Sequence, residues 1–567
     1  MRFVYNTVFI LTGTLLLTCN TGTQHTIQEI KNLEYQRTVN REYFIRWLND
    51  NNAEVRAGAV KSLGRIQDTS TISWVANRLS DPEEAVRAEA AFAMGQFFST
   101  IAENPLRDAI RLEESARVRS MLLEALGKCG TEKSFSIIRD YLNKTDSELQ
   151  QEATIACGLM AYRGFPAYDL MSSLNQILKS SESPEISWRA AYAFYRIGSA
   201  SAFKSLIDLL THPDPITRYY TLKTQSIIVD YIKKEASARY QSNLLISEIK
   251  RMIQSEKYTD FLETLLEDST WYVRLEALQI IGSIKPTNLL PAIQKRIEDE
   301  NPHIRTLALK TIAISETRES RRIIDDFLAI SQDWRDCGEV LLGLSESRPQ
   351  QAISYIQNKL ASVSWPENYY FIQTLGNIKT KSSNQLLLKL ADTGNIAQMS
   401  LALEILSRRS GILTSEMMLQ KLEIRDPAIT TIMADRLAQL KDTMAVSALI
   451  ETYRYFQAPM DLEPMMAILV ALDSIYHPSS IPFLKQISDT TKYLPLSRIA
   501  RQSLQRITGH RLSRTDSAER SLARTDFPGI PAEAEIRVIL KTTRGNFELE
   551  LFPNKAPVTV ANFLDLV

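Results

Sequence analysis

The sequence is poor in glycine, in cysteine and in net charge. Its 567 residues include only 19 glycines, below the share of roughly 7 per cent in an average protein, and this scarcity favours helices. Lys and Arg together number 66, as do Asp and Glu, so the formal net charge is zero. A balanced chain has no overall field that would attract nucleic acid or an anionic membrane surface.

Residues that form disulfides or bind metals are also few. None of the five histidines has the spacing of a paired metal ligand. The four cysteines are too few and too scattered for a disulfide framework or a zinc cluster: Cys19, Cys129, Cys157 and Cys337. Two of them, Cys129 and Cys157, lie inside helical patterns, where cysteine usually acts as a small buried apolar residue. We predict neither a metal site nor a cofactor.

The N-terminus has the features of a secretory signal. Arg2 is followed by an apolar run from Val8 to Leu17, which is too short to cross about 30 Å of hydrocarbon as a helix. The run ends in Leu16-Leu17-Thr18-Cys19, which resembles a bacterial lipobox apart from Thr18. The resemblance implies that residues 1–18 are removed and that Cys19 becomes the lipidated first residue.

The residues after Cys19 are polar and have no helical or strand period, so we expect residues 19–40 to form a tether between the lipid and the folded chain. The alternative is an ordinary cleaved signal in which Cys19 has no special role. We favour the lipoprotein because the cysteine stands where the apolar run stops.

The rest of the chain is dominated by an internal repeat. A Val-Arg or similar pair is followed by a small residue and then by an apolar residue and a glycine. These glycines are Gly64, Gly95, Gly127 and Gly158, spaced 31, 32 and 31 residues apart. Later copies contain Trp188-Arg189 with Ile197-Gly198, Val273-Arg274 and Ile304-Arg305, and a last copy is expected at Ile499-Ala500-Arg501.

Each repeat predicts two helices. Apolar residues follow the helical period in both halves of the second repeat: Ile72, Val75, Leu79, Val86, Ala90 and Met94. Between the two halves, Asp81 is expected to cap the second helix and Pro82 to occupy its first position. The glycine after the second helix is expected to take the left-handed conformation and end it.

One such helix pair cannot bury its apolar faces alone, so pairs must stack. The spacing and the pattern resemble the HEAT family in its short bacterial form. They fit tetratricopeptide repeats poorly, because those need about 34 residues and other signature positions. The resemblance predicts an all-α superhelical solenoid over residues 41–510, with a concave surface for a protein partner or client. Bilin lyases also contain short HEAT-like repeats, but the sequence indicates no chromophore site.

The recurrent arginines allow two interpretations. They could form a ladder that binds a ligand, or they could pair with acidic residues along the seam between repeats. The family resemblance favours the structural interpretation.

The pattern changes after Gly509. Residues 511–535 are polar and contain Phe527-Pro528-Gly529-Ile530-Pro531, which is typical of a linker. From residue 536 to 551, apolar and polar residues alternate on both sides of a turn at 543–546, which predicts a two-stranded hairpin with one apolar face. A helix is expected to begin at Ala556-Pro557.

Residues 536–567 resemble the start of cyclophilin-type prolyl isomerases. The resemblance rests on the Glu548-Leu549-Glu550-Leu551-Phe552 strand and on Gly545, Ala556, Pro557, Thr559, Asn562 and Phe563. It implies a domain that isomerises X–Pro bonds in proline-containing polypeptides. In that family an arginine, an aromatic wall and a glutamine surround the reacting bond, and all lie downstream of the matched segment. We therefore assign no catalytic residue in this chain.

This assignment has a chemical consequence. Rotation about a peptide bond has a barrier of about 18–20 kcal/mol, and the groups that would stabilise the twisted amide are expected after Val567. We predict that the present chain is inactive, and we interpret Val567, in mid-helix, as an interruption of the domain. A hairpin alone is marginally stable in water, so we expect residues 536–567 to be disordered or aggregation-prone in isolation.

Together these features predict a protein-folding factor of the bacterial cell envelope, lipid-anchored and facing the periplasm or the cell surface. Its HEAT solenoid would hold a client or a partner complex beside a cyclophilin-type isomerase. The alternative is a non-catalytic, membrane-anchored interaction scaffold with a vestigial C-terminal segment. Nucleic-acid binding is disfavoured by the zero net charge and by the predicted signal.

Overall fold

The computed structural model describes residues 22–144, 147–180, 183–236, 244–360, 365–509, 535–543 and 545–566. Two units are distinguished, Met1–Phe261 with Glu519–Val567 (unit 1) and Leu262–Ala518 (unit 2). Three predicted features lie outside the described residues. They are the predicted signal at residues 1–18, the predicted anchor residue Cys19 and nearly all of the predicted linker at 511–535. Among the described helices, none combines the length and the apolar character that crossing a membrane requires.

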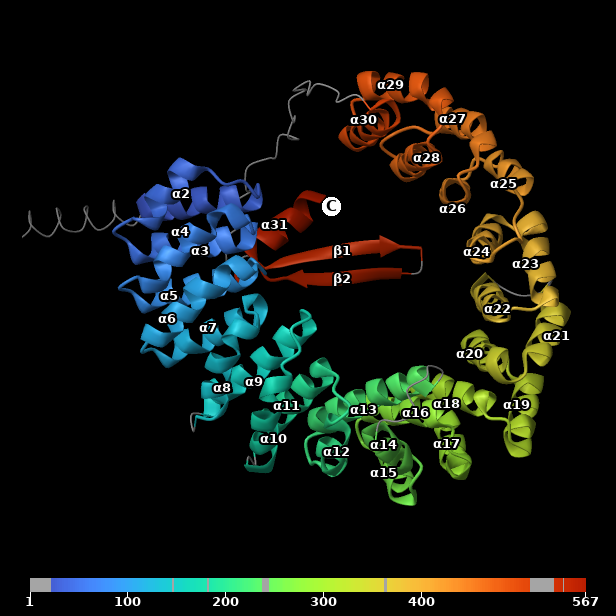
Figure 1. Cartoon of the computed structure of the whole chain (residues 1–567), viewed down its shortest axis with the longest axis horizontal. Coiled ribbons are helices and arrows are strands. Elements are labelled where there is room, and N and C mark those ends of the chain that lie inside the picture. Colours follow the sequence, from blue (N-terminus) through green and yellow to red (C-terminus); the bar gives the residue numbers. More distant parts are fainter. Residues whose placement is uncertain are drawn as a thin grey trace, which may run out of the picture. The chain divides into compact units, whose positions relative to one another are not determined.

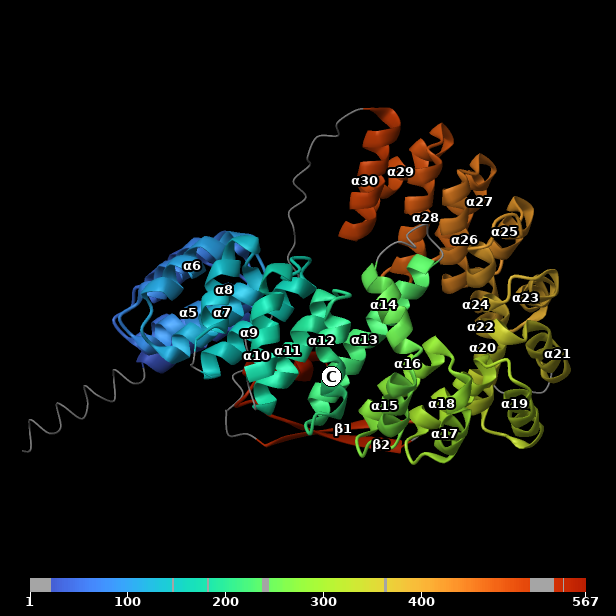
Figure 2. The same ribbon diagram turned by 60° about the horizontal axis from the view of Figure 1, so that its bottom comes forward.

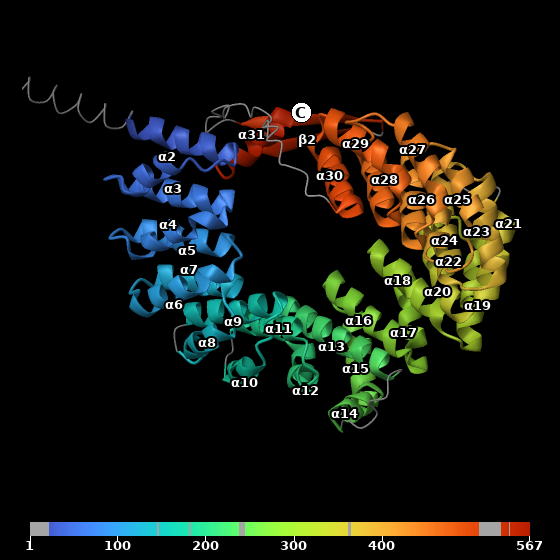
Figure 3. The ribbon, with the colours of Figure 1, turned by 45° about the horizontal axis from the view of Figure 1, so that its top comes forward.

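Unit 1 is a stack of helix pairs (Figure 3). The first helices are α2 (Arg41–Leu48), α4 (Ile72–Ala76), α6 (Glu103–Leu112), α8 (Phe135–Leu142), α10 (Met171–Ser180) and α12 (Ala202–Leu206). The second helices are α3 (Ala53–Ile66), α5 (Glu84–Gln96), α7 (Ala116–Cys129), α9 (Ser147–Tyr162), α11 (Pro184–Ile197) and α13 (Pro215–Ala236). Each second helix packs on the second helix of the next repeat, as a solenoid requires. Helix α14 (Leu244–Ile253) follows, and α15 (Glu256–Leu266) contains the boundary between the two units at Phe261.

Unit 2 has the same two layers, with its first helices on the outer side of its second helices (Figure 1). The first helices are α17 (Leu290–Lys295), α19 (Arg318–Ile330), α21 (Pro349–Lys359), α23 (Lys381–Thr393), α25 (Ser415–Leu422), α27 (Val446–Tyr455) and α29 (Ile481–Thr490). The second helices are α16 (Trp271–Ile284), α18 (Pro302–Ile314), α20 (Trp334–Ser347), α22 (Trp365–Asn377), α24 (Ile396–Ser407), α26 (Pro427–Leu440), α28 (Leu462–Ile475) and α30 (Leu494–Thr508). Figure 2 shows α26, α28 and α30 side by side. The predicted all-α solenoid is confirmed.

The core is the apolar layer between first and second helices. The second repeat is representative, because its predicted stripes are buried: Ile72, Val75, Leu79, Val86, Ala90 and Met94 are each at most 7% exposed. The helix period therefore located the core correctly. Burying such side chains is the main stabilising term, at about 25 cal/mol for each Å² of apolar surface removed from water.

The repeat glycines differ from the prediction. Gly64, Gly95 and Gly127 lie inside α3, α5 and α7 rather than after them. A Cβ on Gly64 would stand 2.6 Å from the Cα atom of Ala93, so glycine is needed there for close helix approach. The predicted left-handed capping role is confirmed at two later repeat glycines, Gly198 and Gly509, with φ values of 65° and 69° at the ends of α11 and α30.

The predicted start of the second helix in the second repeat is also wrong. Glu83, not Asp81, is the N-cap residue of α5, and Pro82 lies before the helix. The predicted tether at 19–40 is helical from residue 22 to residue 35. Ile30, only 2% exposed, packs beside Gly58 of α3 and explains why this polar segment folds.

The C-terminal segment of unit 1 forms the predicted hairpin and helix. Strand β1 (Ile536–Thr542) pairs antiparallel with β2 (Gly545–Leu551), and α31 (Pro557–Leu566) follows. Cross-strand pairs put Ile536 opposite Leu551 and Leu540 opposite Phe547, which makes one face of the hairpin apolar.

Candidate functional site

The recurrent arginines join neighbouring repeats. In unit 1, the Nε and Nη2 groups of Arg56 on α3 donate hydrogen bonds to the two carboxylate oxygens of Asp81, at 2.9 and 2.8 Å. Asp81 belongs to the next repeat, directly after the 3-10 helix η2 (Asn77–Ser80). The remaining nitrogen, Nη1, donates to the backbone carbonyl oxygens of Asp50 and Asn51, which follow α2. One guanidinium thus donates hydrogen bonds to the free carbonyl groups after α2 and also binds the following repeat.

The same arrangement recurs in both units. Arg87 binds Glu113 through Nε at 2.8 Å, and Arg274 in unit 2 binds Asp299 through Nε at 3.0 Å. We call these three residues, Arg56, Arg87 and Arg274, the arginine ladder. Each also donates Nη1 to carbonyls five and six residues earlier in the chain. Pairing with acidic residues along the seam is confirmed for these three arginines, whereas Arg305, within the described residues, donates only to the backbone carbonyl oxygens of Asp299 and Glu300.

The electrostatics agree with tight pairing. Burial alone would raise the pKa of the Asp81, Glu113 and Asp299 carboxyl groups. The hydrogen bonds and charges of the paired arginines, with backbone N–H donors, outweigh burial and lower all three pKa values. The carboxylates therefore stay ionised and paired, and none is poised as an acid or base.

Arg189 is not part of this pattern, contrary to the sequence prediction. It binds the backbone and carboxylate of Glu185 on its own helix. Ala193 meets Gly158 as Ala156 meets Gly127, and counting back six residues from Ala193, as from Ala93 to Arg87, puts Ser187 in the ladder position. The repeat between α9 and α11 is longer than the earlier ones, so fixed spacing assigned the wrong residue.

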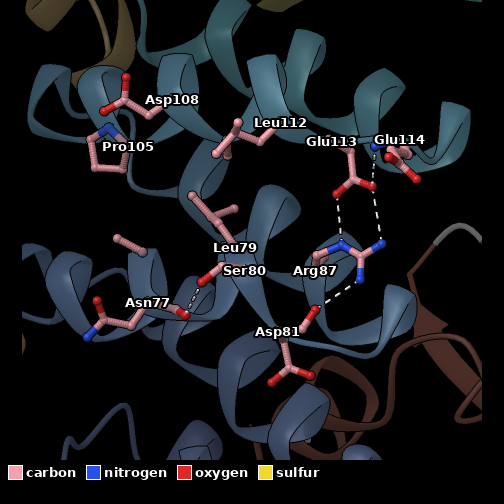
Figure 4. A pocket seen from close by; sticks show the side chains of 12 residues that line it. Asn77, Leu79, Ser80, Asp81, Arg87, Pro105, Asp108, Leu112, Glu113 and Glu114 are labelled. Carbon is pink, nitrogen blue, oxygen red and sulfur yellow. Dashed lines mark hydrogen bonds and ion pairs between the residues drawn. The ribbon is translucent and has the colours of Figure 1, made fainter.

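A hollow of about 630 Å³ lies between η2 and α6 in unit 1 (Figure 4). Leu79 and Leu112 form its apolar walls, and the Arg87–Glu113 pair lies at one end. Unit 2 has a hollow of about 430 Å³ around Arg274 and Asp299. Both hollows lie between neighbouring first helices, and each adjoins a pair of the arginine ladder. We therefore interpret them as a product of repeat stacking rather than as a specific ligand site.

The described residues contain no cluster of three or more His, Cys, Asp or Glu side chains that could hold a metal ion. Cys129, Cys157 and Cys337 are buried free thiols. Burial raises the pKa of Cys157 to about 12, so this thiol is not an activated nucleophile.

The cyclophilin-like residues lie along the hairpin and α31. Gly545 begins β2 with a φ of 128°, a conformation that favours glycine. Ala556 precedes α31, and Pro557 is its first residue. Thr559 and Asn562 are exposed on α31, while Phe563 is half-buried. The structure therefore brings the predicted motif residues into one short segment.

Comparisons with known proteins agree with this architecture. A family described as HEAT repeats matches residues 42–108, 72–158 and 259–345. A family described as cyclophilin type peptidyl-prolyl cis-trans isomerase/CLD matches residues 537–567. Deoxyhypusine hydroxylase of Candida albicans is 23% identical over 264 residues, which is 44% of this chain and 81% of that protein.

Solved structures are similar to the chain at low TM-scores and low identity. Importin beta has a TM-score of 0.38 at 13% identity, over 82% of this chain and 67% of that one. The complex of CpcE and CpcF of phycocyanin lyase from Nostoc sp. PCC7120 has a TM-score of 0.27 at 16% identity, over 45% and 94% of the two chains. An engineered protein has a TM-score of 0.31 at 16% identity, over 78% and 99%.

The stacked helix pairs and the matched ranges show that the chain contains HEAT repeats. More particularly, the chain joins HEAT repeats to a cyclophilin-type segment at residues 537–567.

Proposed function

We propose that the protein is a lipid-anchored folding factor of the bacterial cell envelope. Its HEAT solenoid holds a polypeptide client, and a cyclophilin-type domain isomerises X–Pro bonds in that client. The observation that carries the proposal is the joining of both families in one chain, with the motif residues Gly545 to Phe563 in the expected hairpin and helix.

The two halves complement each other physically. Uncatalysed X–Pro isomerisation takes tens of seconds or more, which is long compared with most folding steps. A client held on the solenoid meets the isomerase at an effective concentration that a short tether can raise to about the millimolar range. The catalyst itself needs only an apolar proline pocket and a donor to the amide nitrogen of the twisted bond.

A prolyl-peptide isomerisation assay tests the enzymatic half. The sample is the complete gene product, including whatever is encoded after residue 567, and residues 1–567 serve as the matched control. We expect acceleration by the complete product and none by the control, since no catalytic group is assigned before Val567. A rate for the complete product equal to that in buffer would remove the enzymatic half.

A second candidate is a non-catalytic scaffold. The hairpin favours it, because Ile539, Leu540 and Phe547 are 57%, 38% and 61% exposed and no catalytic residue is assigned in this segment. The downstream DNA decides between the two. A continuation, in frame or frameshifted, that encodes an arginine and a Gln-Gly-Gly-like segment supports the enzyme. Unrelated sequence after an authentic stop supports the scaffold.

The envelope location rests on the lipobox-like residues around Cys19. Metabolic labelling with a fatty acid tests it directly. We expect label on the wild-type protein and none on Cys19→Ser, with Cys129→Ser as the control that keeps the label. Equal labelling of wild type and Cys19→Ser would remove the anchor from the proposal.

A further inference from the structure

The solvent-facing stripe of the second helices changes character along unit 1. In α3 it carries Lys61 and Arg65, which pair with Glu89 at 2.8 Å and Glu34 at 2.9 Å. In α11 the corresponding stripe carries Trp188, Tyr192 and Tyr195, which are partly exposed at spacings of four and three residues. A charged surface thus gives way to an aromatic one.

These rings form one continuous cluster across neighbouring helices. Tyr220 of α13 lies at the centre, with ring centroids 6.3 Å from Trp188, 5.3 Å from Tyr192 and 6.1 Å from Tyr195. The Trp188 and Tyr220 rings stack at an interplanar angle of 24°. Tyr192 packs over Gly158 of α9, where a Cβ would approach its ring to 2.5 Å. Packing on three helices therefore fixes the rings in place before any ligand arrives.

One cation in the cluster has no counter-charge. The Arg196 guanidinium lies 4.6, 5.3 and 5.0 Å from the ring centroids of Tyr162, Tyr192 and Tyr195. Its Nε is buried without a hydrogen-bond partner, and no carboxylate pairs with it in the described part of the chain. Arg189, by contrast, is paired with Glu185.

This combination selects the chemistry of a ligand. The positive charge of Arg196 repels a cationic ligand, such as a quaternary ammonium group, from these rings. Aromatic-lined surfaces recognise proline-rich segments, whose extended conformation is largely preformed. An unpaired arginine at the same place suits a carboxylate. A single unpaired arginine is poorly suited to follow the phosphates of a nucleic acid.

We propose that this aromatic platform, formed by Tyr162, Trp188, Tyr192, Tyr195, Arg196 and Tyr220, binds extended proline-containing polypeptide segments that carry a carboxylate near the proline. The platform extends along α13 to Ile227 and Tyr231, which are 41% and 49% exposed and can take further apolar side chains. This deepens the proposed function, on which it rests, by naming the client segment and its place on the solenoid.

Fluorescence anisotropy with the full chain and a labelled peptide of alternating proline and alanine with one glutamate tests the platform. We expect Trp188→Ala to weaken binding about tenfold, because buried tryptophan anchors are among the residues whose truncation weakens a protein interface most. The control Tyr168→Ala removes a 57% exposed tyrosine at the start of the 3-10 helix η5 (Tyr168–Leu170) and should leave binding unchanged. Thermal unfolding verifies that each variant folds.

Arg196→Gln removes the positive charge and leaves the aromatic rings unchanged. It therefore tests the proposal even if Trp188→Ala does not fold. It should weaken the glutamate peptide about fivefold and leave a glutamine peptide unchanged. The platform is rejected if alanine replaces all prolines without loss of affinity, if Tyr168→Ala weakens binding as much as Trp188→Ala, or if an oligo-dT strand competes as well as the peptide. None of these measurements depends on isomerase activity. Peptide binding can therefore be established if the isomerase assay fails, and isomerase activity can be established if the peptide does not bind.

Discussion

Arg56 connects three parts of unit 1 through a single side chain. Its guanidinium contacts the end of α2 and the carboxylate of Asp81 in the next repeat, and the two side chains are only 10% and 1% exposed. A buried ion pair of this kind adds little to the free energy of unfolding compared with an apolar pair of the same shape. Removing one partner, however, leaves the other charge buried and unpaired, which is strongly destabilising.

We therefore expect Arg56→Ala to lower the free energy of unfolding by about 3–5 kcal/mol. The matched control is Arg117→Ala, because Arg117 also reaches a neighbouring repeat, at 3.8 Å from Glu84, with side chains 65% and 49% exposed. That variant should lose no more than about 1 kcal/mol. Urea unfolding measures both, and equal losses would show that the ladder is not a structural element.

The ladder also predicts how stability depends on pH. The folded pKa values of Asp81, Glu113 and Asp299 are lowered, so their stabilisation is present above the unfolded values of about 3.9–4.3 and is lost as pH falls through the folded values. The variant carrying Asp81→Asn, Glu113→Gln and Asp299→Asn should have a lower Tm than wild type at pH 7. This difference should narrow towards pH 3. A difference that stays constant from pH 7 to pH 3 would contradict the pairing.

At the scale of the helix, glycine controls how closely repeats stack. Ala on Gly64 would gain up to about 1 kcal/mol of helix propensity, but its Cβ would meet the Ala93 backbone at 2.6 Å. We expect Gly64→Ala to destabilise unit 1 by about 1–3 kcal/mol through overpacking.

The same helix offers the control. Gly58 has only the Ile30 Cδ1 atom nearby, at 3.7 Å from an added Cβ. Gly58→Ala should be neutral or stabilising by up to about 1 kcal/mol. Thermal unfolding distinguishes the two variants, and a similar Tm change for both would refute the role assigned to close approach.

The hairpin is the element with the least support. Phe547 and Phe552 are 61% and 50% exposed, and the apolar face of β1 and β2 is largely open. Because two strands alone are marginal, amide hydrogens of residues 536–551 should exchange with little protection, while those of α5 and α7 should be strongly protected. Strong protection of the hairpin would contradict this expectation and would show that another surface covers its apolar face.

Some elements could be predicted because local sequence determines them. The helical period of Val86, Ala90 and Met94, like the alternation along β1, places apolar residues on one face whatever the surroundings. The role of Gly64 could not be predicted from the sequence. Glycine is needed there because of Ala93, 29 residues away, and the local sequence does not distinguish this reason from a position at a helix end. The platform was missed because Trp188 and Tyr192 have the same spacing as core residues.

For the whole molecule, the repeats determine which surfaces are available. First helices cover one side of each unit, so the second helices present the surface on which a polypeptide can lie. Among the described second helices of unit 1, α9, α11 and α13 are those that combine clustered rings with an unpaired arginine. We therefore expect a client to bind at this part of the solenoid.

Hydrogen exchange of the full chain, with and without the proline-containing acidic peptide, tests this claim most directly. We expect the peptide to increase protection in α9, α11 and α13, to leave α16 to α30 unchanged, and to have no effect on Trp188→Ala. Protection spread evenly over the second helices of both units, or confined to residues 536–566, would contradict it.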